Sequence, residues 1–425
     1  MKHDRLDRAL ERLDALVDWE RRDRGDMVRT LAPIEDILER LERPHEAWSS
    51  VLVAGTKGKG SVSALVGAAL DGAGLAVGVY ASPHVEEVTE RVSVAGEPVS
   101  REELAAGLEA ALEAREAALS ESTPGAEATW FDLMTAGAFE VFRARGVDWA
   151  VVEVGIGGRL DSTRAIDPTV SVVTSVGLEH TQTLGSTRAE IAAEKGAVVA
   201  PGGVLVTGIP PEDEEVFPVL ERLCDEAGAS LVTVPQRGPV EARNRALAEV
   251  VLNELGRRGA CSASGDPLWR SHLDAAAVEA ARLPARGERF LLDGVQVVLD
   301  GGHVATSATL LLDELERDPE LGRCPKLVLA LGREKDAPAI LKALDGRVDR
   351  LMCTSAPEGR LLEAEELAEQ ASQVGHDPEA WDDPLEALSE ALEDARTGGG
   401  WVLVFGSFYL AGVLRTALAE AQCAS

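Results

Sequence analysis

The sequence is short of closely spaced cysteines and of long apolar runs, and both shortages exclude classes of protein. Its five cysteines stand far apart without Cys-x-x-Cys spacing, which argues against a disulfide framework or a zinc site and indicates reduced thiols. No run of 18 apolar residues occurs, and the charged segment 1–25 lacks the apolar stretch of a signal peptide. We therefore expect a soluble, cytoplasmic protein that does not span a membrane.

Positive charge is also scarce. The 425 residues include 42 Lys and Arg against 73 Asp and Glu, a formal net charge of −31. This excess of negative charge argues against nucleic acid or an anionic membrane surface as the main partner. An anionic small molecule would need a local nest of backbone N–H groups and a few well-placed cations. The length and the 45% hydrophobic content predict two or three domains, each with its own core.

What the sequence does contain is an alternation of short apolar segments with helical stretches, which predicts a mostly parallel, doubly wound sheet. In the first part of the chain we expect strands at 50–54, 75–80, 149–154, 170–175 and 201–207, and helices within 4–44 and at 62–72 and 101–119. After a hinge-like segment, 283–287, we expect further strands at 295–299, 326–331, 350–354 and 401–405. The predicted fold is α/β: a P-loop domain over residues 1–286, then a smaller Rossmann-like α/β domain over 287–425.

The strongest local signal is a glycine-rich loop between a predicted strand and a predicted helix. The loop comprises Gly55, Thr56, Lys57, Gly58, Lys59, Gly60 and Ser61. Glycines let the backbone wrap around phosphate, and a helix N-terminus offers unpaired N–H groups. Only seven residues of the chain are lysines, and two lie in this loop. The alternative is a flexible glycine turn, but the strand–loop–helix context favours a nucleotide site, although GKGS departs from the standard GK[ST] ending.

Three further segments place polar residues just after predicted strands, where ligands collect in open α/β sheets. The segments are YASPH with Ser82, VVEVGIGGRLDST with Glu153 and Asp161, and TSVGLEHTQTLGST with His180. Glu153 closes an apolar strand, which indicates a Mg²⁺ ligand, and the alternative is a buried acid paired with Arg159. Taken alone, Ser82 would belong to a simple turn, and His180 would be a structural histidine.

The order and intervals of these motifs resemble the folylpolyglutamate synthase and dihydrofolate synthase family, part of the Mur ligase group of ATP-dependent amide ligases. The resemblance continues through AAEKGAVVAPG, NRALA, LPAR, DGGH and VFGSFYLAGVL, and it includes the N-terminal segment DWERRDRG at 18–25. It departs from the usual pattern at Lys57, at Arg164, at Gly196-Ala197 and after His303, where Val304-Ala305 follows. These departures concern the specificity of the pterin and amino-acid pockets.

The resemblance implies a role for each matching residue. Lys59 and the Gly55–Ser61 loop are expected to hold the phosphates of ATP. Ser82 and Glu153 are expected to bind one Mg²⁺, and His180 and a carbamylated Lys195 a second. Lys195 could instead be a surface lysine of a helix. The remaining implied roles are an acid near the pterin for Asp161, adenine contact for Asn244, nucleotide contacts for Arg286 and Asp300, and glutamate binding for His303 and Ser407.

The implied reaction activates a substrate carboxylate with ATP as an acyl phosphate, which the amine of L-glutamate then attacks. The expected acceptors are tetrahydrofolate and dihydropteroate, the expected cofactors are ATP, Mg²⁺ and a monovalent cation, and the family precedent favours a monomer. Two alternatives remain open. One is a Mur-type ligase with a non-folate acceptor, and the other is a nucleotide-binding regulator without ligase activity.

Overall fold

The computed structural model describes residues 4–16, 30–322, 324–357 and 359–424. These residues form two compact units. The N-terminal unit comprises residues 1–82 and 89–282, and the C-terminal unit comprises 83–88 and 283–425. The units therefore divide four residues before the boundary that the sequence suggested, and six residues from the middle of the N-terminal half belong to the C-terminal unit. The family segment 18–25 lies outside the described residues.

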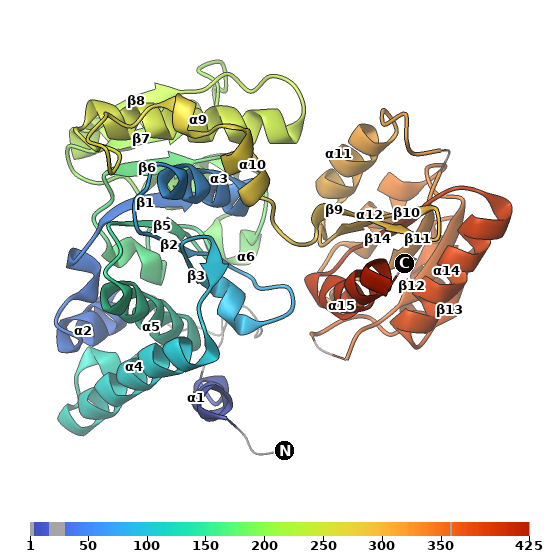
Figure 1. The fold of residues 1–425 in the computed structure, drawn as a ribbon, viewed down its shortest axis with the longest axis horizontal. Coiled ribbons are helices and arrows are strands. Elements are labelled where there is room, and N and C mark those ends of the chain that lie inside the picture. Colours follow the sequence, from blue (N-terminus) through green and yellow to red (C-terminus); the bar gives the residue numbers. More distant parts are fainter. Residues whose placement is uncertain (1–3, 17–29, 323, 358, 425) are drawn as a thin grey trace. The chain divides into compact units, whose positions relative to one another are not determined.

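The N-terminal unit is built on an eight-stranded sheet in the order β4-β3-β2-β5-β1-β6-β7-β8. All pairings are parallel except those of β3 with β2 and with β4 (Figure 1). The strands are β1 (Ser49–Ala54), β2 (Val77–Tyr80), β3 (Val92–Val94), β4 (Glu97–Pro98), β5 (Trp149–Glu153), β6 (Val170–Val173), β7 (Val204–Thr207) and β8 (Ser230–Thr233). The sheet confirms the doubly wound, mostly parallel architecture.

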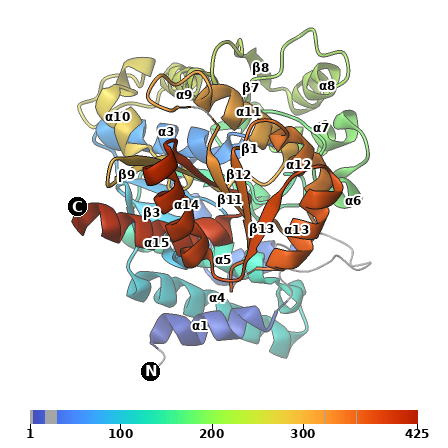
Figure 2. The ribbon, with the colours of Figure 1, turned by 90° about the vertical axis from the view of Figure 1, so that its right-hand side faces the viewer.

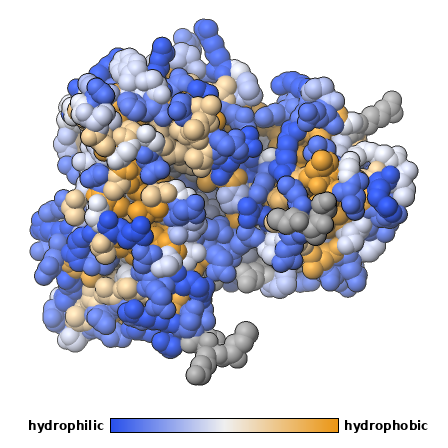
Figure 3. All heavy atoms as spheres, in the orientation of Figure 1, coloured by the Kyte–Doolittle hydropathy of each residue, from blue (hydrophilic) through white to orange (hydrophobic). Residues whose placement is uncertain are grey.

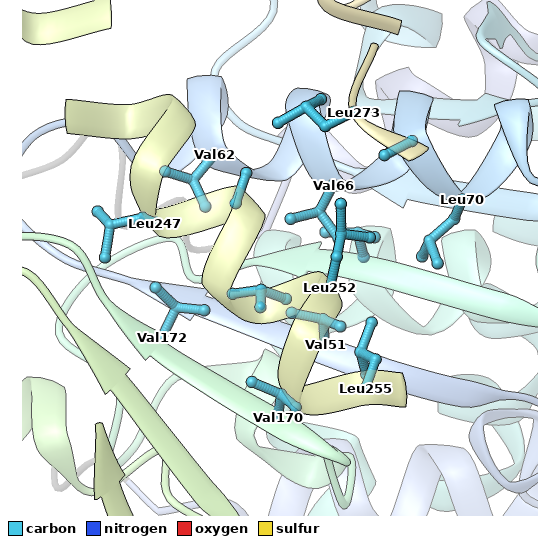
Figure 4. Packing of buried hydrophobic residues seen from close by; sticks show 14 of the residues in the cluster. Val51, Val62, Val66, Leu70, Val170, Val172, Leu247, Leu252, Leu255 and Leu273 are labelled. Carbon is cyan, nitrogen blue, oxygen red and sulfur yellow. The ribbon is translucent and has the colours of Figure 1, made fainter. Parts of the chain in front are cut away.

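Helices cover both faces of this sheet (Figure 1). They are α1 (Arg5–Asp14), α2 (Ala32–Arg40), α3 (Lys59–Gly72), α4 (Arg101–Glu121), α5 (Trp130–Arg145), α6 (Thr181–Leu184), α7 (Arg188–Gly196), α8 (Phe217–Ala227), α9 (Val240–Arg257) and α10 (Ala275–Ala280). On one face, α3 and α9 pack on the central strands through a fully apolar core (Figure 4). On the other face, α5 packs through Phe139 and Phe142, which make edge contacts with Trp48.

The order of these elements determines where a ligand can lie. Strand β1 sits at the centre of the sheet, with β5 on one side and β6 on the other. The loops that follow β1, β5 and β6 therefore meet at one edge of the sheet, at the point where the strand order reverses. Such a switch point is where open α/β sheets bind ligands.

The C-terminal unit is a six-stranded sheet in the order β13-β12-β11-β14-β10-β9, parallel except for β9. Figure 2 shows this sheet between α14 and α15 on one side and α11, α12 and α13 on the other. The elements are β9 (Arg286–Leu292), β10 (Val295–Asp300), α11 (Ala305–Leu315), β11 (Lys326–Leu329), α12 (Ala337–Leu344), β12 (Arg350–Thr354), α13 (Ala364–Gln373), β13 (Pro378–Trp381), α14 (Pro384–Gly398), β14 (Val402–Phe405) and α15 (Phe408–Ala424).

Two expectations from composition can be compared with the structure. None of the helices within the described residues is both long and apolar enough to cross a membrane. Cys224, Cys261, Cys324 and Cys353 are free thiols, as expected. Hydrophilic residues prevail on the face of the molecule that Figure 3 shows, which agrees with the large net charge.

Candidate active site

The glycine-rich loop follows β1 and ends at the first turn of α3, as predicted. Gly55 has φ +147°, and a Cβ there would lie 1.9 Å from Thr174 Oγ1. Gly58 has φ +86°, and a Cβ there would lie 2.5 Å from Asn244 Oδ1. Both positions therefore require glycine for space and for backbone conformation. The same geometry places Asn244, on α9, directly beside the loop.

Residues at the end of β6 brace the loop, and sequence analysis did not single them out. The backbone N–H of Thr56 donates to the carbonyl of Ser175 at 2.9 Å, and that of Lys57 donates to Ser175 Oγ at the same distance. The Thr174 hydroxyl donates to the carbonyl of Lys57 at 2.6 Å. The sequence signal for this contact was the polar pair Thr174-Ser175 at the end of an apolar strand. The loop that the pair contacts lies about 120 residues earlier in the chain, so the sequence alone did not connect them.

Lys59, Glu153 and Ser82 meet beside this loop. Lys59 Nζ donates to the carbonyl of Gly55 at 3.1 Å and lies 4.0 Å from Glu153 Oε1. The backbone N–H of Ser82 lies 3.5 Å from Glu153 Oε2. Arg159, the alternative partner of Glu153, instead donates to Glu194 at 2.6 Å. The structure thus brings together a cation, a buried carboxylate and the backbone of a serine at one edge of the sheet.

Lys195 is the most deeply buried cation of the site, with 1% of its surface exposed, so it is not a surface lysine. Its Nζ donates to the carbonyl of Gly55 at 3.0 Å and to Glu179 Oε1 at 2.6 Å. Burial lowers the pKa of Lys195 to about 8, against the opposing effect of the Glu179 charge. Burial of Glu179 acts to raise its pKa, but the charges of Lys195 and Lys59 outweigh this effect and lower it.

Glu179 is a further residue that sequence analysis missed as a partner of Lys195. It precedes His180, whose φ of +46° is unusual for a residue with a side chain. His180 is exposed at the N-terminal end of α6. The short turn therefore directs Glu179 inward, toward Lys195, and leaves His180 accessible to a ligand.

Asp161 is buried and holds the shape of its own loop. Its Oδ2 accepts from the Ile156 N–H at 2.9 Å, and its Oδ1 accepts from the Thr163 N–H and hydroxyl at 3.1 and 2.5 Å. Burial raises the pKa of Asp161. The loop packs on the end of α7, because a Cβ at Gly158 would lie 2.8 Å from the carbonyl of Glu194.

The predicted residues of the C-terminal unit lie near one another within that unit. Asp300 accepts from the N–H groups of Gly287 at 2.9 Å and Gly302 at 2.7 Å, so both of its oxygens shape backbone turns. The Arg286 guanidinium lies 4.6 Å from the centre of the Phe408 ring, and His303 meets the edge of the same ring. Ser407 immediately precedes Phe408, and its Oγ accepts from the Tyr409 N–H at 3.1 Å.

The residues beside the glycine loop fit a phosphate-bound Mg²⁺ better than a metal held by protein alone. Within the described parts of the chain, no group of three His, Cys, Asp or Glu side chains is placed to hold a metal. Mg²⁺ that bridges substrate phosphates needs only one or two protein oxygens and keeps several waters. The Glu153 carboxylate offers one such oxygen next to a loop suited to phosphate, and Ser82, whose backbone N–H lies 3.5 Å from that carboxylate, is the candidate for a second.

Comparison with known proteins gives a consistent result. The family described as "Mur ligase, glutamate ligase domain" matches residues 282–408. The chain is 30% identical to dihydrofolate synthase/folylpolyglutamate synthase of Escherichia coli, over 84% of this chain and 83% of that protein. It is 32% identical to a probable bifunctional folylpolyglutamate synthase/dihydropteroate synthase of Haloferax volcanii, over 90% of this chain but 48% of the relative. The chain thus spans about half the length of that archaeal relative.

Solved structures agree over nearly the whole length. Folylpolyglutamate synthase of Mycobacterium tuberculosis, complexed with ADP, superimposes with a TM-score of 0.83 at 26% identity, covering 97% of this chain and 98% of that one. The bifunctional synthase of Yersinia pestis, complexed with AMPPNP and a Mn ion, gives 0.79 at 27% identity with the same coverage. Fold and matched family together place the chain in the Mur ligase class of proteins. Within that class, this chain belongs to the folylpolyglutamate synthase/dihydrofolate synthase family.

Proposed function

We propose that this protein joins L-glutamate to the γ-carboxylate of tetrahydrofolate at the expense of ATP, and that it also accepts dihydropteroate to form dihydrofolate. The observation that carries the proposal is the convergence of Lys59, Lys195, Glu153 and Ser82 around the Gly55 loop. The paired names of the bacterial relatives support the second acceptor.

The first chemical step is phosphoryl transfer. An oxygen of the acceptor carboxylate attacks the γ-phosphorus of ATP, the bond to the β-phosphate oxygen breaks, and an acyl phosphate and ADP result. The Gly55–Ser61 backbone and the Lys59 ammonium hold the phosphates in line and offset their charge. Asn244 is proposed to contact the nucleotide base, and its position against Gly58 of the loop supports this role.

Mg²⁺ bound through Ser82 and Glu153, with a second ion near His180, would supply further charge neutralisation at the phosphates. Lys195 is suited to carbamylation, because the neutral amine attacks CO₂ and releases a proton, and its pKa of about 8 keeps a substantial neutral fraction near neutral pH. A carbamate is an oxygen donor that arginine cannot provide. In the unmodified protein, the Lys195 ammonium instead draws Glu179 and the Gly55 carbonyl together.

The second step is acyl transfer to glutamate. The amine nitrogen attacks the acyl carbonyl carbon, phosphate leaves, and the nitrogen loses a proton to give the amide. In the C-terminal unit, His303 and Ser407 are proposed to bind the incoming glutamate, while Arg286 and Asp300 contribute to nucleotide binding. Asp161 is proposed to order the loop beside the pterin and Lys195. We further propose that the protein acts as a cytoplasmic monomer, with a monovalent cation as an additional cofactor.

The test is phosphate release with Mg²⁺-ATP and L-glutamate, comparing tetrahydrofolate, dihydropteroate and no acceptor, with product masses determined. We expect release only when an acceptor is present, and a product heavier by one glutamyl unit. Acceptor-independent hydrolysis would contradict ligase function. A protein that binds ATP but uses neither acceptor would contradict the folate assignment and favour a non-folate carboxylate.

A further inference from the structure

The loop after β6 runs along the glycine-rich loop, and both lie within the N-terminal unit. Ser175 holds both backbone groups of Lys57: its Oγ accepts from the Lys57 N–H at 2.9 Å and donates to the Lys57 carbonyl at 3.1 Å. The Thr174 hydroxyl donates to the same carbonyl at 2.6 Å. The N–H of Gly177 donates to Thr56 Oγ1 at 3.0 Å. The glycine-rich loop is therefore held from the β6 side at two successive residues.

These contacts determine which way the carbonyl groups of the glycine-rich loop point. A carbonyl oxygen carries partial negative charge, so an oxygen directed at a bound phosphate would repel it. The hydroxyls of Thr174 and Ser175 hold the Lys57 carbonyl toward the end of β6. The Gly55 carbonyl is held in the same way by two lysine ammonium groups, at 3.0 and 3.1 Å. Both carbonyls are thus engaged by donors of the protein itself before an anion binds.

The glycine-rich loop needs such support because its own sequence gives it little rigidity. Gly55, Gly58 and Gly60 make up half of residues 55–60, and glycine loses more conformational freedom on ordering than any other residue. A loop that became ordered only when its ligand bound would lose affinity for that ligand. Thr174 is buried and directly follows a strand that has neighbours on both sides, so it provides a rigid point of attachment.

We propose that Thr174 and Ser175 are positioning residues that hold the glycine-rich loop in its phosphate-binding shape before nucleotide arrives. The inference rests on the proposed function, because it assigns both residues a role in the affinity for ATP. Neither hydroxyl touches the nucleotide in this account, since both are used to hold Lys57. Their effect is to reduce the conformational entropy that the loop loses when nucleotide binds.

The test measures the affinity for Mg²⁺-AMPPNP by calorimetry, together with amide hydrogen exchange of residues 55–60, in the full-length protein. Ser175→Ala removes both side-chain hydrogen bonds to Lys57, so it should weaken binding about tenfold and speed exchange of the Lys57 N–H. Thr174→Val keeps the shape of the side chain but removes one donor, and it should weaken binding about threefold. Thr174→Ser retains the hydroxyl and should bind within about twofold of the wild type.

Ser171→Ala and Thr207→Val are the matched controls, because each removes a buried hydroxyl of the same sheet that donates to a backbone carbonyl outside the glycine-rich loop. Both should lower the free energy of unfolding without changing nucleotide affinity or exchange in residues 55–60. The inference is overturned if Ser175→Ala binds Mg²⁺-AMPPNP within about twofold of the wild type, or if the two controls weaken binding equally. Failure of the proposed function is recognised separately, because the wild-type protein itself would then fail to bind Mg²⁺-AMPPNP or to glutamylate an acceptor.

Discussion

The two sheets each bury one lysine, and the two lysines behave in opposite ways. Lys195 lies at the carboxyl edge of the N-terminal sheet and meets one carboxylate and one backbone carbonyl. Lys326 begins β11 in the C-terminal sheet and pairs with both Asp349 and Asp394. Burial acts to lower the pKa of both, but the two carboxylates outweigh it at Lys326 and raise its pKa, whereas that of Lys195 falls to about 8.

This contrast shows that burial alone does not mark a functional lysine. Lys326 has the charge balance of a structural ion pair, with its partners partly exposed to water. Lys195 has less compensation than its burial requires, and it shares its carbonyl partner with Lys59 of the phosphate loop. A perturbed group in such surroundings is typical of an active site.

The largest expected effect separates the two lysines by activity. Lys195→Arg should reduce glutamate ligation at least about 100-fold, because arginine forms no carbamate and the electrostatic arrangement at the phosphates is lost. Lys326→Arg should retain turnover within about twofold, since arginine can bind the same two aspartates. Steady-state assays, with circular dichroism to confirm folding, would measure both. Turnover of Lys195→Arg within tenfold of wild type would contradict the distinction between a functional Lys195 and a structural Lys326.

The free energy of unfolding should distinguish the two lysines in the opposite way, with the loss of stability at Lys326. Lys326→Met leaves Asp349 and Asp394 without their shared cation and should lower the free energy of unfolding by about 2 kcal/mol, less than for a fully buried pair because both acids reach water. Denaturant titration would measure the loss, and the turnover of the folded variant should be unchanged. A matching loss of turnover would show that this lysine also serves catalysis.

The comparison can be extended to buried acids. Glu153→Gln should weaken Mn²⁺ binding in the presence of AMPPNP at least about tenfold, because a neutral amide replaces the charged ligand. Glu254, also buried in the N-terminal unit but paired with Arg257 on α9, provides the control. Glu254→Gln should leave Mn²⁺ affinity unaffected. Equal affinities in the wild type and Glu153→Gln would contradict the proposed metal site.

The smallest expected effect is the dependence of Lys195 carbamylation on pH. With a pKa of about 8, the neutral fraction of Lys195 should rise about fivefold between pH 7 and pH 8, and the carbamate formed from ¹³C-bicarbonate should rise with it. The pKa of Lys195 in the folded protein lies below its unfolded value, so burial of the charged lysine lowers the free energy of unfolding by its full amount below pH 8. This loss of stability decreases as pH rises from 8 toward 10.5. Carbon-13 spectra would show one lysine carbamate, absent from Lys195→Arg. A signal retained in that variant would assign the carbamate elsewhere.

Sequence reasoning found what is local and missed what depends on distant contacts. It placed the Gly55 loop between β1 and α3 because strand, glycine and helix signals are adjacent in the chain. It did not find α5, whose apolar residues are too continuous to show one helical face, or the small strands β3 and β4. It could name Lys195 only by resemblance, since a nine-residue helix reveals little about which side is buried.

The same limit applies to partners within the site. The contact of Glu179 with Lys195 requires the turn at His180, where the backbone adopts an unusual conformation that no pattern signals. The hydrogen bond from Thr174 to the Lys57 carbonyl joins residues 117 positions apart, so only the folded chain reveals it. The predicted roles of Asp161, His303 and Ser407 remain predictions, because the hydrogen bonds seen for these side chains shape their own loops.

The most direct test of the central claim follows an oxygen atom. If the carboxyl edge of the N-terminal sheet activates an acceptor carboxylate as an acyl phosphate, ¹⁸O in the γ-carboxylate of tetrahydrofolate must appear in the released phosphate. We predict one ¹⁸O per phosphate in each ligation event, measured by mass spectrometry. Phosphate without the label, formed together with the glutamylated product, would show that the carboxylate never attacks ATP and would contradict the account.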